Sequence, residues 1–369
     1  TNPAGHAYER HTLDRPSPCV SPKDYAANFQ DFLDDRPDGA PFCFWYGGHE
    51  PHRPYHPGEG AEHGTYVATG DVPGYLPNDE VVRNDLADYA FEVQWFDAHL
   101  GRMLRELERR GELDNTLVVV TSDNGMPFPR VKGQMYDYDF RLPMAAMWGT
   151  GRRSPDAEPV VLSDMISFTD IAPTFLEAAA IESRPEMSAR SFLALLSAER
   201  SGRFDPARDR VCMGRERHDL GREGDVGYPV RCIRTDTHLY VRNFKPELWP
   251  AGNPETGFTG CDSSPTKTLI LAQHEEGYDR YFDLAFGKRP LEELYDVARD
   301  PDCLHNLADE QALAEIKRAL WDELRGYLTG QLDPRILGNG DVFDRYEYVG
   351  KASHSWKAYV EGNWEPQRY

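Results

Sequence analysis

The segment VVVTSDNGMPFPRVKGQMYDYDFRLPM, residues 118–144, contains the features that decide the fold. Its β-branched start is typical of a buried strand, and this strand stops at Asp123-Asn124-Gly125. Asn-Gly and Asp-Asn are common turn residues, so a plain tight turn explains the stop as well as a ligand site does. One lysine, Lys132, follows in a proline-containing loop. An acid, an amide and a cation after one strand raise the question of function, which the flanking sequence has to answer.

The flanking sequence alternates between strand and helix patterns. Apolar residues recur every three or four positions over 78–111, which predicts a long helix, and a strand follows at 116–121. The apolar runs at 41–48, 142–149 and 160–167 predict further strands, the first of them buried on both faces. This alternation predicts an α/β domain whose central sheet is mostly parallel and flanked by helices. Ligands in such sheets gather at the carboxyl ends of the strands, where the Asp-Asn pair lies.

The pattern changes beyond about residue 205. Short strand-like segments joined by turns, followed by a last helix near 312–328, predict a smaller C-terminal subdomain with an antiparallel sheet and a helix. We therefore predict two domains, one over residues 1–205 and one over residues 206–369.

Composition excludes several classes of protein. The net charge is −21, and no basic cluster of the kind that binds nucleic acid is visible. No apolar run approaches the roughly 20 residues of a membrane-spanning helix. The six cysteines fit no zinc-binding spacing. An acidic chain can still act on an anionic substrate, but only through a local cationic pocket or a metal ion.

Five residues could form such a pocket. Asp123 and Asn124 offer oxygen ligands that suit a hard cation such as calcium or magnesium, although two ligands are too few. His49 and His52 could ligate a metal, bind an anion or transfer a proton, unless their loop is merely rich in histidine. Lys132 could pair with a sulfate or phosphate oxygen, or simply be solvated.

The order of the segments decides between these alternatives. From about residue 40 to 310 the chain resembles the C-terminal two-thirds of a sulfatase of the alkaline-phosphatase-like superfamily, and SDNGMPFP resembles the heparan N-sulfatase (sulfamidase) branch. Residues 1–205 then correspond to the C-terminal portion of the sulfatase α/β catalytic domain. The matching segments are PFCFWYGGHEPHRPY (41–55), VVVTSDNGMPFPRVKGQMYD (118–137), RLPMAAMWG (141–149), DIAPTFLEAAAI (170–181) and LEELYDVARDPDCLHNLA (291–308).

The resemblance implies roles for these residues. Sulfatases hold one calcium ion with an Asp-Asn pair that matches Asp123 and Asn124, together with two further aspartates from the first strand. Residues that match His52 and Lys132 contact the sulfate, and we predict these two as catalytic. The negative charge of the sulfate oxygens repels a nucleophile. Calcium and cationic side chains such as Lys132 would neutralise this charge.

Substrate-binding residues are predicted from two segments. His49 and Arg53 are neighbours of His52 in the first segment. Arg217 and His218, in the sequence RERHD, offer cationic groups that suit sugar hydroxyls and carboxylates. The alternative is that both segments are ordinary surface loops.

The family nucleophile is a formylglycine made from a Cys-x-Pro-Ser-Arg motif, and this motif does not occur in the chain. PSPCVSPKD, around Cys19, lacks the arginine. We expect the motif and the first-strand aspartates in an N-terminal segment of the same protein, which would also be a partner of this chain. The expected location, by resemblance, is periplasmic or exported in bacteria and lysosomal in animals.

The sequence therefore predicts a sulfatase that hydrolyses sulfate esters or sulfamates of a sulfated sugar or glycosaminoglycan fragment, with N-sulfoglucosamine as a candidate. The alternatives are a phosphomonoesterase or phosphodiesterase of the same superfamily, which usually holds two zinc or manganese ions, and a non-catalytic glycan-binding fragment. We expect one Ca²⁺ as cofactor, and neither a nucleic-acid partner nor a membrane span.

Overall fold

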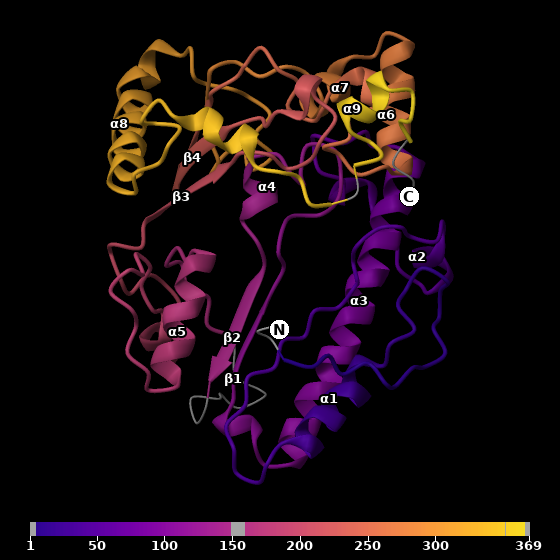
Figure 1. Ribbon diagram of the computed structural model, residues 1–369, viewed down its shortest axis with the longest axis vertical. Coiled ribbons are helices and arrows are strands. Elements are labelled where there is room, and N and C mark those ends of the chain that lie inside the picture. The colour runs from indigo at the N-terminus through magenta and orange to yellow at the C-terminus, as the bar shows by residue number, and fades with distance from the viewer. Residues whose placement is uncertain (1–4, 149–158, 351, 366–369) are drawn as a thin grey trace. The chain divides into compact units, whose positions relative to one another are not determined.

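The computed structural model describes residues 5–148, 159–350 and 352–365 (Figure 1). Contacts divide the chain into two compact units. Unit 1 comprises the chain up to Thr116 together with Ser264–Leu269, and unit 2 comprises Leu117–Ser263 and the chain from Ile270 onward. The predicted domain boundary at residues 205/206 remains a prediction.

Unit 1 is built around the long helix α3 (Glu80–Arg109), as the periodicity predicts. Asp79 caps its start by accepting a hydrogen bond from the Val81 amide, and its buried stripe includes Val82 and Leu86. Helices α1 (Tyr25–Asp35) and α2 (Glu59–Glu62) pack on α3 (Figure 1). The remaining helical segments of unit 1 are η1 (Thr69–Asp71) and η2 (Leu113–Asn115).

The prediction of a doubly buried strand at 41–48 is wrong. The segment pairs with no strand in the described part of the chain, and the Trp45 side chain is 83% exposed. Phe44 and Tyr46 instead pack their rings against Phe29 of α1 and Phe96 of α3. The segment is thus covered on one side only, because helices rather than neighbouring strands supply its contacts.

Unit 2 begins with the strand β1 (Leu117–Thr121), which pairs with β2 (Met144–Trp148). Both strands were predicted, but the ladder is antiparallel, with Thr121 opposite Met144. The loop between them returns the chain to the end of the sheet where β1 stops, whereas a parallel pair needs a crossover to the other end. The mixed α/β class is confirmed, while the described strands form only antiparallel ladders. The predicted strand at 160–167 is reduced to one parallel bridge, from Leu162 to Gly202.

The second sheet of unit 2 confirms the predicted antiparallel C-terminal α+β subdomain. Its order is β3-β4-β5-β6, with every neighbouring pair antiparallel. Alternation along β4 places Val230 and Cys232 in one core and Ile233 in another. Leu320 and Leu324 of α8 lie in the second core with Ile233. The strands are β3 (Arg210–Arg215), β4 (Val230–Thr235), β5 (His238–Asn243) and β6 (Glu292–Asp296).

Helical segments lie between and after the strands of unit 2. They are α4 (Asp137–Phe140), η4 (Phe168–Asp170), α5 (Ile171–Ala178), η5 (Leu193–Ser197), η6 (Glu223–Asp225), η7 (Pro254–Thr256), α7 (Arg280–Ala285), η8 (Gln311–Leu313), α8 (Ala314–Gly330), η9 (Gly340–Arg345) and α9 (Trp356–Val360). Helix α6 (Pro265–Glu275) has residues in both units.

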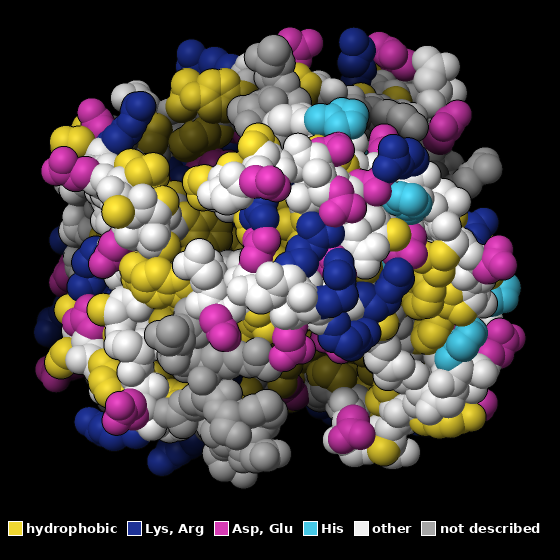
Figure 2. All heavy atoms as spheres, turned by 90° about the horizontal axis from the view of Figure 1, so that it is seen from below, with side chains coloured by type: hydrophobic (Ala, Val, Ile, Leu, Met, Phe, Trp, Pro, Cys, Tyr) yellow, Lys and Arg dark blue, Asp and Glu magenta, His cyan; other side chains and the backbone are white. Residues whose placement is uncertain are grey.

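The net charge of −21 is not gathered into one continuous acidic surface on the face drawn in Figure 2, where acidic side chains are scattered among basic and apolar ones. None of the helices in the described ranges has the length and hydropathy needed to cross a membrane.

Candidate active site

The histidine loop of unit 1 follows the extended 41–48 segment. The exposed rings of His49 and His52 lie with their centroids 5.5 Å apart. His52 Nδ1 lies 2.6 Å from the carbonyl oxygen of Arg53. Because a carbonyl oxygen only accepts, Nδ1 carries the proton in this contact, and Nε2 is the nitrogen that can accept or deliver a proton elsewhere.

Arg53 holds this loop on α3. Its two terminal nitrogens donate to the two carboxylate oxygens of Asp85 at 2.8 and 3.0 Å, and both side chains are buried. The guanidinium also lies 4.4 Å from the ring centre of Tyr55. Asp85 further accepts a 2.6 Å hydrogen bond from the hydroxyl of Thr266. These contacts anchor the loop, and the predicted contact of Arg53 with substrate stays a prediction.

In unit 2 the conformation of the SDNG turn, residues 122–125, requires its glycine. A Cβ atom at Gly125 would lie 2.2 Å from the carbonyl oxygen of Tyr138, so only glycine fits there. Asn124 Nδ2 donates to the Gly125 carbonyl at 2.7 Å, which leaves the amide oxygen as the acceptor end of the side chain. The Asp123 side chain is exposed. Within the described ranges, no three His, Cys, Asp or Glu side chains are grouped so as to hold a metal ion.

Lys132 and His218, which lie far apart in sequence, meet in unit 2. Lys132 Nζ lies 2.9 Å from Asp262 Oδ2, and both side chains are largely shielded. Gly133 has φ of +75°, and a Cβ atom there would lie 2.5 Å from His218 Cδ2. The His218 ring therefore packs on the backbone directly after Lys132.

The surroundings of His218 favour its neutral form. Burial against the protein, followed by the charge of the Arg215 guanidinium, lowers the pKa of His218 below its ordinary value. Because the side chain keeps a solvent-exposed part, water moderates this shift. At neutral pH, His218 is thus a hydrogen-bonding group rather than a second cation beside Lys132.

Asp139, in the short helix α4 between β1 and β2, was not predicted from the sequence. Burial raises the pKa of its carboxyl to about 7, against the opposing effect of Arg215 and of the Gly133 and Gly125 amides. This acid therefore titrates near neutral pH next to the SDNG turn and Lys132. Nothing in the local sequence sets it apart from an ordinary surface aspartate.

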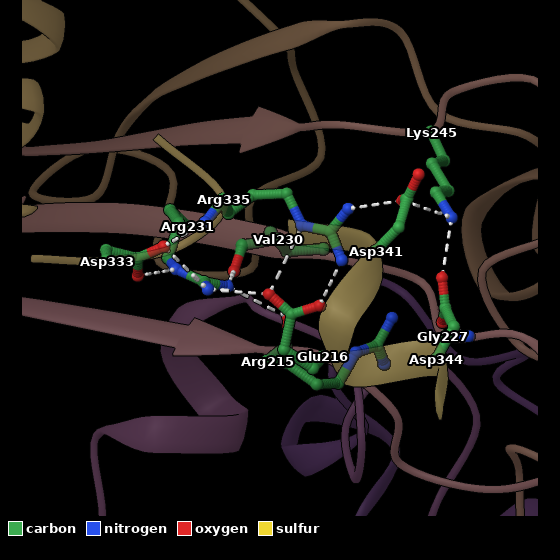
Figure 3. A network of polar contacts seen from close by, with 10 residues as sticks. All are labelled: Arg215, Glu216, Gly227, Val230, Arg231, Lys245, Asp333, Arg335, Asp341 and Asp344. Carbon is green, nitrogen blue, oxygen red and sulfur yellow. Dashed lines mark hydrogen bonds and ion pairs between the residues drawn. The ribbon is translucent and has the colours of Figure 1, made fainter. Parts of the chain in front are cut away.

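Arg217 faces the C-terminal part of the chain. Its Nη2 donates to the carbonyl oxygen of Tyr346 at 2.6 Å, and its guanidinium lies 5.8 Å from the ring centre of Tyr348. The segments before and after it are held by a polar network (Figure 3). In that network, Glu216 accepts 2.6 Å hydrogen bonds from both Arg231 and Arg335.

Comparisons with known proteins find sulfatases among the relatives of this chain. Residues 1–181 match the Sulfatase family model. The chain is 27% identical over 280 residues to an ulvan-active sulfatase of Formosa agariphila, covering 74% of this chain and 43% of that protein. It is 27% identical over 285 residues to the N-sulphoglucosamine sulphohydrolase of Homo sapiens, covering 74% of this chain and 53% of that one.

A solved structure shares the fold. The yidJ protein of Bacteroides fragilis, a candidate sulfatase, superposes with a TM-score of 0.58 at 17% identity, over 85% of this chain and 59% of its own. The mixed α/β architecture is thus that of the alkaline-phosphatase-like proteins. Within this fold, residues 1–181, just under half of the chain, match the Sulfatase family model. The chain spans about half the length of the curated relatives that it matches.

Proposed function

We propose that this chain is part of a sulfatase that hydrolyses the sulfate ester or sulfamate of a sulfated carbohydrate, with N-sulfoglucosamine as the first candidate. The observation that supports this most is in unit 2, where a lysine follows the SDNG turn and His218 packs on the next residue, Gly133. A cation beside a neutral imidazole suits a sulfated sugar, which offers both anionic oxygens and hydroxyl groups. The human relative named for N-sulfoglucosamine points to the same substrate.

Asp123 and Asn124 would hold the calcium ion of the family. An exposed carboxylate and an amide oxygen at a strand end are the ligand types that calcium prefers, and other ligands must complete its shell. When bound, calcium supplies positive charge that neutralises the sulfate oxygens.

The other residues bind and orient the sulfate group. Lys132 would pair with a sulfate oxygen while Asp262 holds its ammonium group in place. Nδ1 of His52 is bound to a carbonyl oxygen, so Nε2 would face the leaving atom of the substrate and deliver a proton to it. His218 would accept or donate a hydrogen bond to the sugar, and Arg217 would meet a more distant anionic group.

His49 and Arg53 are the remaining residues of the proposed site. His49 would contact the substrate, and Arg53 would keep the histidine loop anchored to Asp85 of α3. The nucleophile, a formylglycine in this family, is placed by this proposal in a part of the protein outside residues 1–369. This placement agrees with the greater length of the relatives.

The test measures sulfate release by the full-length gene product. N-sulfoglucosamine and 6-O-sulfated glucosamine serve as substrates with added calcium, for the wild type, Lys132→Ala and Lys288→Ala. Lys288 is an exposed lysine of the same unit and serves as the control. Release from the N-sulfated sugar that falls at least a hundredfold in Lys132→Ala alone is the expected result.

Two other results would overturn parts of the proposal. Release from only the 6-O-sulfated sugar would keep the activity and replace the substrate. Sugar binding without release from either substrate would favour a glycan-binding protein. Metal analysis adds an independent check, since two zinc or manganese ions in place of one calcium would indicate a phosphoesterase.

A further inference from the structure

The C-terminal part of unit 2 lies along the 216–227 loop that contains Arg217 and His218. We call residues 333–350 and 352–356 the C-terminal strap. Figure 3 shows how the strap holds both ends of the loop. At one end Arg335 donates to Glu216 at 2.6 Å, and at the other Asp344 accepts from the Gly227 amide at 2.7 Å.

Further contacts hold the middle of the loop. His354 Nε2 lies 2.8 Å from Asp219 Oδ1, and the Tyr348 hydroxyl donates to the same oxygen at 3.4 Å. The Trp356 amide donates to Asp225 at 2.7 Å. Strap contacts therefore occur at both ends and at the middle of the loop, in addition to hydrogen bonds within the loop such as that from the Gly221 amide to Asp225.

The Asp219–His354 contact is an ion pair when His354 is protonated. Burial opposes ionisation of Asp219, but the hydrogen bond and charge of His354 outweigh it and lower the pKa of this carboxyl. The hydrogen bond to Asp219 raises the pKa of His354. The charged groups that face His354 are Asp219 and Asp225, both from the loop.

Asp219 directly follows His218 in the chain, so a contact that holds Asp219 also restrains the backbone of His218. His218 in turn packs on Gly133, next to Lys132. A continuous series of contacts therefore runs from the strap, through Asp219 and His218, to the lysine proposed to bind sulfate.

We propose that His354 is a positioning residue, which holds Asp219 so that His218 stays packed beside Lys132 for binding of the sulfated sugar. This inference rests on the proposed function for the identity of the ligand. Its structural part, the dependence of His218 on His354, stands on the contacts within unit 2 alone.

The test uses the whole chain and three histidine variants. His354→Ala removes the contact, His354→Gln retains an N–H donor for Asp219, and His305→Ala alters an exposed histidine that also faces an aspartate. Calorimetry measures the Kd for N-sulfoglucosamine, and NMR follows the titration of the His218 ring.

In His354→Ala we expect the Kd to rise about tenfold, as for loss of one hydrogen bond to a charged group. We also expect the pKa of His218 to move up toward its ordinary 6.5, because a looser loop lets the ring move away from Gly133 and from the Arg215 guanidinium. His354→Gln is expected to stay within about twofold of the wild type, and His305→Ala to match it.

The inference is overturned if His354→Ala retains both the wild-type Kd and the wild-type titration of His218 while Lys132→Ala abolishes binding. If the wild type does not bind the sugar, the proposed function fails instead. The titration of His218 then still decides whether His354 positions the loop.

Discussion

A buried pair of carboxyl groups in unit 1 makes its stability dependent on pH. Glu92 of α3 and Glu59 of α2 are both 0% exposed. No donor in the described part of the chain reaches either oxygen of Glu92 or Oε2 of Glu59. Burial, followed by the charges of Glu59 and Glu50, raises the pKa of Glu92 to about 9. Glu92 is therefore protonated in the fold at neutral pH.

The magnitude follows from the two protonation states. In the unfolded chain Glu92 ionises above its ordinary pKa of 4.5, whereas in the fold it keeps its proton up to about pH 9. The free energy of unfolding therefore falls by about 1.4 kcal/mol for each pH unit between these values. From pH 5 to pH 8 the loss from this one group is about 4 kcal/mol at most.

Glu92→Gln removes this loss, because the amide cannot ionise and can donate to Glu59. We expect the variant and the wild type to differ little in their pH dependence below pH 4.5. The stability of the variant relative to the wild type should then rise by up to about 4 kcal/mol between pH 5 and pH 8.

The assay is urea unfolding followed by fluorine NMR of 5-fluorotryptophan at Trp95, which lies on α3 and reports on unit 1. Glu108→Gln, an exposed position on the same helix, serves as the control and should not change the pH dependence. If Glu92→Gln and the wild type differ by the same free energy at pH 5 and pH 8, Glu92 is ionised in the fold and the reasoning is refuted.

Three further predictions concern the proposed site. Asp85→Asn leaves the buried guanidinium of Arg53 without its carboxylate, and unit 1 should lose about 3–5 kcal/mol in the same urea assay; a loss below about 1 kcal/mol would contradict this. Gly133→Ala should weaken sugar binding at least tenfold by displacing His218, whereas Gly277→Ala, with a similar positive φ and open space around it, should leave binding intact. Asp123→Ala should weaken calcium binding at least tenfold by calorimetry, and an unchanged affinity would place the ion elsewhere.

Local patterns were enough to predict most of the secondary structure. The 3.6-residue periodicity of α3, with its aspartate cap and Gly111 beyond its end, is a property of neighbouring residues and needs no tertiary contact. The same holds for β1 and the turn after it, where β-branched residues give way to Asn-Gly. The short strand-like segments joined by turns likewise predicted the antiparallel C-terminal sheet.

Pairing and burial were not predictable in the same way. Trp45 lies in an apolar run that looks doubly buried, yet which side of an extended segment is covered depends on what packs against it. The antiparallel ladder of β1 and β2 depends on the path of the loop between them. Both features are decided by distant parts of the chain, which leave no periodic signal in the local sequence.

For the candidate site too, some features follow from the local sequence and others from tertiary contacts. The sequence by itself determined its chemical types, because Asp123, Asn124 and Lys132 follow one strand as a carboxylate, an amide and a cation. Only the tertiary structure decided their partners: Asp262 beside Lys132, and His218 against Gly133. A partner in such a pair is selected by its position in space, and an aspartate or histidine far away in the chain looks the same in sequence whether or not it makes the contact.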